Sequence, residues 1–213
     1  MQIRVNPYTY FLENQQAFWA RLNTHLTLSF AALLISVLVC VPLGIWISRR
    51  ARAAQYVINT FNALRVLPSL VILFFALPYL GLGFRPALIA LTILAFPPVL
   101  INTYAGLRNV DRSVIEAARG MGMAPSQVLQ RVELPLALPA IVAGIRTAAV
   151  EVVSSATLAA FIGGGGLGDF ITRGYSLGEP GIMLVGAIPV ALLAIIFELV
   201  LGGLQQRFST SAA

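Results

Sequence analysis

The chain has 213 residues, of which 58% are hydrophobic and only 10% are charged. Its mean hydropathy is +0.86, whereas about 25% of the residues of an ordinary soluble domain are charged. Because such a chain lacks the polar side chains that would cover a globule in water, its composition excludes a soluble enzyme and indicates a membrane protein.

The net charge of +6 comes from arginine, because the 14 basic residues include no lysine. These arginines lie between apolar runs instead of clustering on one polar face, so they favour topology signals over nucleic-acid binding. With a single cysteine, Cys40, and a single histidine, His25, the chain is expected to hold no disulfide framework, no metal and no cofactor of its own.

The apolar runs predict about five membrane spans, since one spanning helix needs roughly 20 residues. The expected spans are residues 24–48, 55–80, 86–107, 134–161 and 182–204. The predicted fold class is therefore all-α, a polytopic transmembrane helix bundle with one membrane domain over 23–206. Residues 1–22 contain several aromatic side chains and are expected to form an external helix along the membrane interface. Residues 207–213 are expected to form a cytoplasmic tail.

Arginine placement predicts the orientation of these spans. If the connection after the first span is cytoplasmic, eight arginines lie on that side and four on the other. This asymmetry follows the positive-inside rule, so the N-terminus is expected outside and the C-terminus in the cytoplasm. The 162–181 segment, rich in glycine, is then an external loop, and the 108–133 segment is a cytoplasmic one.

Every predicted span contains proline: Pro42, Pro68, Pro97 with Pro98, Pro139 and Pro189. In lipid, a proline frees a backbone carbonyl that a neighbouring helix or water in a cavity must satisfy. The pattern favours bent helices that move around a pathway, with a rigid bundle of bent helices as the alternative.

The 108–133 loop predicts two short helices joined by a glycine turn. Ser113 and Glu116 have the spacing of a capping box, which would start the first helix. Gly120 and Gly122 would end it and allow a sharp bend. Pro125 then suits the first turn of a second helix that leads into the fourth span. Such a projection suits docking into a groove on a partner.

The same loop resembles the EAA motif of ATP-binding-cassette importer permeases. The matching residues are Glu116, Ala117, Ala118, Gly122, Val132, Leu134 and Pro135. The resemblance implies a type I importer permease fold in which these residues couple the spans to a separate ATPase, with Gly122 as the bend.

Further segments resemble the osmoprotectant permeases, which take up quaternary amines such as glycine betaine, choline or carnitine. They include Arg65-Val-Leu-Pro68, Asn102-Thr103-Tyr104, Ala143-Gly-Ile-Arg146 and Gly165-Gly-Leu-Gly-Asp169. The resemblance implies two ATPase subunits, a second permease chain in a homodimer or heterodimer, and an external binding protein, in a bacterial inner membrane. ATP and magnesium would be bound by the ATPase, because this chain has no Walker A sequence.

Four glycines begin the predicted external loop, but no lysine follows them as it would in a phosphate-binding loop. We expect a flexible re-entrant loop at the pathway mouth or the binding-protein interface, with a plain linker as the alternative. Its candidate residues are Gly163, Gly164, Gly165, Gly166, Gly168 and Asp169.

Charged and aromatic residues in the spans are the candidate pathway or gate residues. They are Arg65, Pro68, Tyr79, Tyr104, Arg146, Glu151 and Phe161. A charge at mid-bilayer must face protein or water. Arg146 therefore needs a partner on another helix, for which Glu198 is a candidate, whereas Arg65 could extend its side chain to the cytoplasmic interface. Aromatic faces suit a quaternary ammonium, which has no hydrogen to donate.

Three other functions stay open from the sequence. The first keeps the importer but changes its cargo to methionine or another amino acid. The second is a channel or ion-coupled carrier that works without ATP. The third is a membrane scaffold, in which the bent spans would enclose no polar cavity, although such a role would leave the EAA motif unexplained.

Overall fold

A computed structural model describes residues 5–211, with side chains through residue 209, and this part of the chain is almost entirely helical. The α-helices are α1 (Pro7–Glu13), α2 (Gln15–Ser48), α3 (Ala51–Val66), α4 (Ser69–Leu80), α5 (Phe84–Arg108), α6 (Arg112–Gly120), α7 (Pro125–Val128), α8 (Leu134–Ser155), α9 (Gly168–Leu177) and α10 (Pro180–Ser211). A π-helical turn, η1 (Leu129–Glu133), joins α7 to α8, and a 3-10 helix, η2 (Ala156–Ile162), follows α8.

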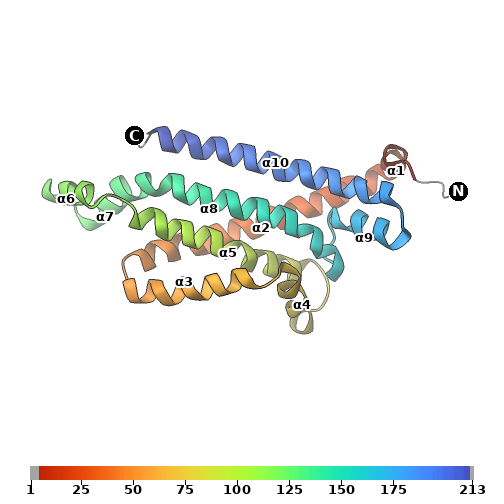
Figure 1. The fold of residues 1–213 in the computed structure, drawn as a ribbon, viewed down its shortest axis with the longest axis horizontal. Coiled ribbons are helices and arrows are strands. Elements are labelled where there is room, and N and C mark those ends of the chain that lie inside the picture. Colours follow the sequence, from red (N-terminus) through yellow and green to blue (C-terminus); the bar gives the residue numbers. More distant parts are fainter. Residues whose placement is uncertain (1–4, 212–213) are drawn as a thin grey trace.

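The long helices run side by side, so the bundle has two ends (Figure 1). Helices α6 and α7 project from one of them, which we call the elbow end, and α10 finishes on the same side. Helices α1 and α9 lie at the opposite end, which we call the far end. The two ends of the described chain therefore lie at opposite ends of the bundle.

Four stretches of the described residues are long and apolar enough to cross a membrane: α2, α5, α10, and the α7–α8–η2 stretch, Pro125–Ile162. The pair α3 and α4 makes a fifth if it counts as one bent span. The fold therefore agrees with the expected all-α bundle of about five spans.

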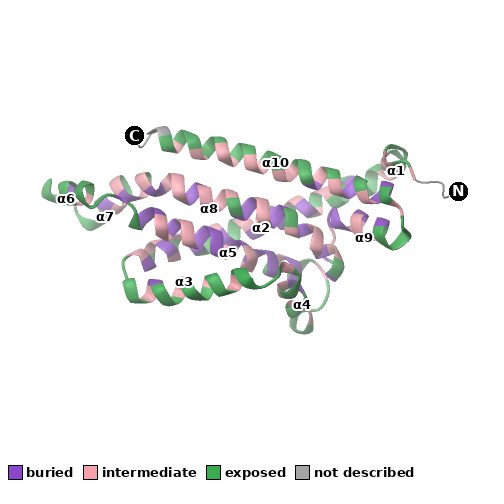
Figure 2. Ribbon diagram, in the orientation of Figure 1, coloured by how far each residue is buried: buried purple, intermediate pink, exposed green. Residues whose placement is uncertain are grey.

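Helix α5 lies at the centre of the bundle and contributes more buried residues than α3 or α4 do (Figure 2). It packs against α2 on one side and α8 on the other. Small residues allow the close approach to α8, because a Cβ on Gly144 would lie 2.6 Å from the Pro98 carbonyl oxygen, and one on Gly106 would lie 2.8 Å from the Cβ of Ala140. Close backbone packing of this kind is typical of helices in membranes.

The predicted span 55–80 is not one straight helix. Helices α3 and α4 meet at an angle of 97°. Leu67 is extended, with φ −71° and ψ 127°, because the ring of the following Pro68 disfavours helical backbone at this position. The sequence indicated a kink at Pro68, and the structure shows a complete break there.

The predicted boundary near residue 22 is also absent. Helix α2 is continuous from Gln15 to Ser48, and the break lies earlier, at Asn14, whose N–H bonds back to the last turn of α1. Neither glycine nor proline interrupts residues 15–40, so nothing local ends the helix. At the other terminus α10 continues through Ser211, into the predicted tail. Residues 1–4 and 212–213 of the two predicted terminal segments lie outside the described residues.

Candidate functional site

The EAA-like residues form a helix–turn–helix elbow, which we define as α6, α7 and the turn between them, residues 112–128. Asp111 starts α6: its Oδ1 accepts the backbone N–H of Ser113 at 2.8 Å. This bond lowers the pKa of the Asp111 carboxyl below its usual value, because it stabilises the ionised form. The predicted capping box at Ser113 and Glu116 is therefore wrong, since the residue that caps α6 is Asp111, two residues before Ser113.

Gly122 makes the bend as predicted. Its φ is +82°, in the left-handed region that favours glycine. The preceding Met121 donates its N–H to the Ala117 carbonyl at 3.0 Å, and the following Met123 donates to Ala118 at 3.2 Å, which ends α6. A Cβ on Gly122 would meet nothing within 4 Å, so the backbone conformation, and not lack of space, requires glycine here.

The second helix leads into α8 without a break. Pro125 occupies the first turn of α7 as predicted, and Gln127 Oε1 accepts the N–H of Ala124 at 2.9 Å. The chain then widens into the π-helical turn η1, where Leu134 donates its N–H to the Leu129 carbonyl. Pro135 has no N–H to continue the regular ladder, which accounts for irregular pairing at this point. A displacement of the elbow can therefore pass directly into α8.

The residues of the elbow and of its junction with α8 are buried, half-buried or exposed. Ala118 and Val128 are buried where α6 meets α7, and this packing fixes the angle of the elbow. Glu116, Ala117 and Gly122 are exposed, as is Met121 between them. The elbow thus presents a polar surface with two exposed large apolar side chains, Val114 and Met121. Such a surface is suited to docking on another protein. Val132 and Leu134 are half-buried and Pro135 is exposed, where the chain enters α8.

An ion pair that the sequence reasoning missed anchors the base of the elbow. Glu133 is 3% exposed, and its carboxylate accepts two hydrogen bonds from Arg49 at the end of α2, one of them at 3.1 Å. The bidentate geometry fixes both side chains and ties α2 to the start of α8. Arg49 was interpreted only as a topology signal. The sequence offered one clue, an acidic residue directly before the apolar run of α8.

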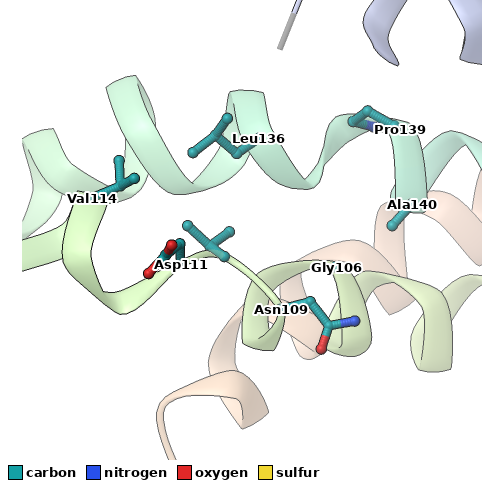
Figure 3. A pocket seen from close by; sticks show the side chains of 8 residues that line it. Gly106, Asn109, Asp111, Val114, Leu136, Pro139 and Ala140 are labelled. Carbon is teal, nitrogen blue, oxygen red and sulfur yellow. The ribbon is translucent and has the colours of Figure 1, made fainter. Parts of the chain in front are cut away.

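A groove of about 380 Å³ separates α6 from the body of the bundle. Figure 3 shows Asp111 and Val114 on one side of it, with Leu136 and Ala140 of α8 on the other. Gly106 and Asn109 from the end of α5 complete the lining. Since the start of α6 borders open space instead of packed side chains, α6 has room to shift relative to α8.

The predicted pathway residues fall into four groups. Arg65, Pro68, Tyr79 and Phe161 are exposed on α3, α4, the link between them, and η2. Tyr104 is half-buried and packs against the central hydrophobic core instead. Arg146 faces α10, where it forms the expected ion pair with Glu198 and donates a further hydrogen bond to Gln205 at 3.2 Å. The remaining one, Glu151, is half-buried on α8.

Arg65 lies in the last turn of α3. It is 14 residues into this helix, which corresponds to about 21 Å from the Ala51 end. The extension of its side chain to the cytoplasmic interface stays a prediction.

The glycine-rich segment is a packed turn with a helix after it. Gly164 donates its N–H to the Ala159 carbonyl at 2.8 Å, and a Cβ there would lie 2.8 Å from the Cβ of Ala87. Gly168 begins α9, so close to η2 that a Cβ would lie 2.0 Å from the Thr157 carbonyl oxygen. Close packing explains these two glycines, so the flexibility expected of this segment is not seen at Gly164 and Gly168. Gly163, Gly165 and Gly166 have positive φ and turn the chain.

An ion pair fixes this segment at the far end. Arg21 of α2 lies 2.5 Å from the carboxylate of Asp169 in the first turn of α9. Burial raises the pKa of the Asp169 carboxyl, and the Arg21 guanidinium opposes the shift. Nearby, His25 Nε2 lies 3.0 Å from the Val153 carbonyl oxygen and joins α2 to α8. The far end is thus a braced cap that joins three helices.

Comparison with solved structures supports the fold. The chain is similar to the inward-facing MetNI methionine ABC transporter, with a TM-score of 0.79, 22% identity, and coverage of 96% of this chain and 99% of that one. It is also similar to an amino acid ABC transporter solved with histidines, with a TM-score of 0.77, 21% identity, and coverage of 97% and 100%. At this identity the likeness establishes the type I importer permease fold.

Curated relatives are more similar in sequence. The carnitine transport permease protein OpuCB of Listeria monocytogenes is 45% identical, over 96% of this chain and 94% of that protein. The choline transport system permease protein OpuBB of Bacillus subtilis is 44% identical, over 87% and 85%. The osmoprotectant import permease protein OsmY of Salmonella typhimurium is 40% identical, over 87% and 79%.

Residues 40–210 match the family described as the binding-protein-dependent transport system inner membrane component. The match takes in the whole elbow, η1 and all of α8, together with the packed glycine segment and nearly all of α10. With full-length relatives above 40% identity and the shared fold, the chain belongs to this family of inner-membrane permease subunits of ABC importers.

Proposed function

We propose that this permease imports trimethylammonium compounds such as carnitine, choline and glycine betaine. Two features support this substrate class. Relatives at 41–45% identity carry these compounds in their names, and the methionine and amino acid transporters that share the fold are only 20–22% identical. The class is defined by a cation that cannot donate a hydrogen bond, so its recognition depends on aromatic faces and diffuse negative charge.

We further propose that the elbow couples the membrane spans to an ATPase, and the structure of the elbow is the observation that supports this. Its exposed face would dock on an ATPase, and its second helix continues through η1 into α8. Closure of the ATPase would then move α6 across the groove in front of α8 and change the tilt of the spans. Two ATPase subunits would bind and hydrolyse ATP with magnesium, one on each elbow of a pair of permease chains. This chain contributes no cofactor to that reaction.

The elbow end would face the cytoplasm and the far end the outside. By sequence, eight arginines fall in or beside the segments expected in the cytoplasm, against four in those expected outside, which is the charge bias of cytoplasmic segments. The braced cap at the far end would then meet the external binding protein, and Gly163–Gly166, Gly168 and Asp169 would shape that surface. The N-terminus would be external and the C-terminus cytoplasmic.

Reconstitution tests this function. The permease would be placed in lipid vesicles with the ATPase and binding protein encoded with it, and uptake of radiolabelled glycine betaine, choline and methionine would be measured. We expect ATP-dependent uptake of the first two and none by the permease alone. Uptake by the permease without the ATPase would establish a channel or carrier instead. Uptake of methionine alone would overturn the substrate class and leave the importer.

A further inference from the structure

The outer face of α3 is polar, whereas the face that packs on the bundle is apolar. On the inner face, Ala54 is 1% exposed and the ring of Phe61 packs on α5. Gln55, Asn59 and Asn62 lie on the other side of the helix and are exposed (Figure 2). Their spacings of four and three residues place them in one row along the helix. We call this row the α3 stripe.

Helix α10 shows what a face suited to lipid looks like in this chain. Its exposed residues include five large apolar side chains that are each more than half exposed: Leu192, Ile195, Ile196, Leu199 and Val200. Such a face suits hydrocarbon, which satisfies no polar group. Helix α3 has the reverse arrangement, with amides outside and apolar side chains inside. The α3 stripe is therefore unsuited to lipid.

The α3 stripe lies at the depth of the hydrocarbon core. Helix α3 begins at the elbow end and runs back beside the bundle (Figure 1). Just before it, Arg50 Cζ lies 4.8 Å from the centre of the Trp46 ring, and residues of this kind mark a membrane interface. Asn59 and Asn62 are 8 and 11 residues beyond Ala51, which corresponds to about 12 and 17 Å along the helix. In a core about 30 Å thick, both positions lie near the middle.

The amides of the α3 stripe have no partner within the described residues. Gln55, Asn59 and Asn62 form no side-chain hydrogen bond in this part of the chain. Asn102 of α5, by contrast, donates its amide N–H to the Pro98 carbonyl at 2.8 Å. Polar side chains at such a depth face the interior of a bundle or a water-filled cavity. Since the α3 stripe faces away from its own bundle, water is the medium that satisfies all of its amides without a matched partner for each.

We propose that the α3 stripe lines the water-filled translocation pathway in the half of the membrane next to the elbow end. This inference rests on the proposed function, because it assigns part of the path that the proposed cargo takes. The amides bind water and carry no charge, so they keep the path hydrated without holding a cation or a carboxylate in place. Tyr56, which is 78% exposed, lies beside Gln55 and Asn59 and offers a ring face to a trimethylammonium group.

Thiol labelling tests whether the α3 stripe faces water. The chain suits this method because its only cysteine, Cys40, is 0% exposed. Asn59→Cys and Asn62→Cys would be made in the complete importer, with its ATPase and second permease chain in lipid vesicles. The probe, supplied on both sides, is 2-(trimethylammonium)ethyl methanethiosulfonate, which carries the trimethylammonium group of the proposed cargo. The thiolate attacks its sulfur, a mixed disulfide forms and methanesulfinate leaves, so the mass of the permease chain reports the reaction.

Ile195→Cys is the matched control, because Ile195 is 54% exposed near the middle of α10 on its apolar face. Hydrocarbon excludes both the thiolate and the cationic reagent, so Asn59→Cys and Asn62→Cys should react at least about tenfold faster than Ile195→Cys. The unaltered chain, in which only Cys40 is present, should not react.

Labelling of the α3 stripe should also block transport. The attached cation occupies the path and repels the cargo, so uptake of radiolabelled choline by labelled Asn59→Cys should fall at least about tenfold. A reducing agent that releases the label should restore this uptake. Ile195→Cys treated in the same way should take up choline as the unaltered importer does.

Fast labelling with loss of uptake at Asn59→Cys or Asn62→Cys would support the proposal. Labelling of both no faster than that of Ile195→Cys would overturn it, because lipid or the second permease chain would then cover the α3 stripe. Fast labelling with uptake retained would also overturn it, since the stripe would face water outside the path. If neither variant copurifies with the second permease chain, the stripe belongs to the interface between the chains and the proposal is overturned.

The proposed function fails in a different way. An unaltered importer that takes up neither choline nor glycine betaine would overturn the proposed cargo. The labelling rates do not depend on the cargo, so they would still decide whether the α3 stripe faces water.

Discussion

The elbow end and the polar face of α8 hold their charges in opposite ways. At the elbow end, Arg49 and Glu133 close on each other in a bidentate pair, and Asp111 caps the first turn of α6. The polar face of α8 is the side on which Thr147, Glu151 and Ser154 lie, at spacings of four and seven residues. Glu151 is half-buried there and has no ion pair among the described residues. The carboxylate of Glu133 is thus satisfied within the described chain, whereas that of Glu151 is not.

The difference separates a contact that fixes two helices from a carboxylate that is left unpaired. A closed, buried pair holds two helices in one relative position, and removing one partner leaves an uncompensated charge. A carboxylate without a partner retains its capacity to interact with another group. An elbow that transmits displacement to α8 must not absorb it, so closed contacts suit the elbow.

The largest loss of stability is expected when Arg49, the exposed partner of the Arg49–Glu133 pair, is removed. Arg49→Ala leaves the carboxylate of Glu133 buried without a partner, which we expect to cost about 3 kcal/mol, the low end for buried ion pairs. Glu133→Gln leaves Arg49, whose side chain is 45% exposed, free to reach water, which should cost about 1 kcal/mol or less. Thermal unfolding of the purified importer compares the two variants.

The double variant Arg49→Ala with Glu133→Gln is the control for this asymmetry. It removes the buried charge together with its partner, so its melting temperature should lie above that of Arg49→Ala alone. Equal melting temperatures for both single variants would contradict the view that the loss of stability comes from leaving the buried carboxylate of Glu133 without a partner.

Local patterns were enough to predict the elbow. Its bend depends on one residue, Gly122, and the start of its second helix on Pro125, so each can be read from a few neighbours in the sequence. The Arg146–Glu198 pair was also predicted, because a charge in a span needs a partner and few acidic residues are available. The capping box failed since Asp111, two residues before Ser113, is an equally good cap.

Features that depend on distant contacts could not be predicted in this way. The partners Arg49 and Glu133 are 84 residues apart, and only the packing of α2 against the start of α8 brings them together. The glycine-rich segment gave a loop signal, but Gly164 and Gly168 are needed because Ala87 and Thr157 pack against them. The sequence predicted a kink at Pro68, whereas the structure has a 97° break there. Helix α4 packs against α5 and η2, and these contacts are distant in the sequence.

The next prediction concerns the bend of the elbow at Gly122. Gly122→Ala forces a Cβ into a left-handed conformation, which should cost about 1–2 kcal/mol and reduce uptake, and Gly122→Val should abolish uptake with membrane insertion intact. Gly120→Ala is the matched control, because Gly120 is helical and a Cβ there also meets nothing within 4 Å. It should leave uptake unchanged and stabilise α6 by up to about 1 kcal/mol.

ATP hydrolysis measured beside uptake reveals how the bend acts. If the elbow transmits motion, Gly122→Val should lose uptake and also lose the stimulation of ATP hydrolysis by loaded binding protein. Normal uptake by this variant would remove the bend from the mechanism.

A smaller effect is expected from the second closed pair. Arg146 and Glu198 are both partly exposed on the sides of α8 and α10, so breaking their pair leaves neither charge fully buried. Arg146→Gln should therefore lower the melting temperature of the purified importer less than Arg49→Ala does. An equal or larger fall would mean that the Arg146–Glu198 pair is buried in the assembled importer.

The smallest effect concerns the cap at Asp111, which depends on pH. Its pKa is lower in the folded elbow than in an unfolded chain, so its contribution is present above the ordinary aspartate pKa and is lost as pH falls through the lowered value. Asp111→Asn keeps an oxygen that can accept the Ser113 N–H at any pH, whereas Asp111→Ala removes it. The protection factor of the α6 amides, which corrects the exchange rate for its intrinsic pH dependence, should therefore fall at acid pH in the unaltered chain, stay high in Asp111→Asn, and be low at every pH in Asp111→Ala. Equal acid sensitivity in Asp111→Asn would mean that another group controls the start of the elbow.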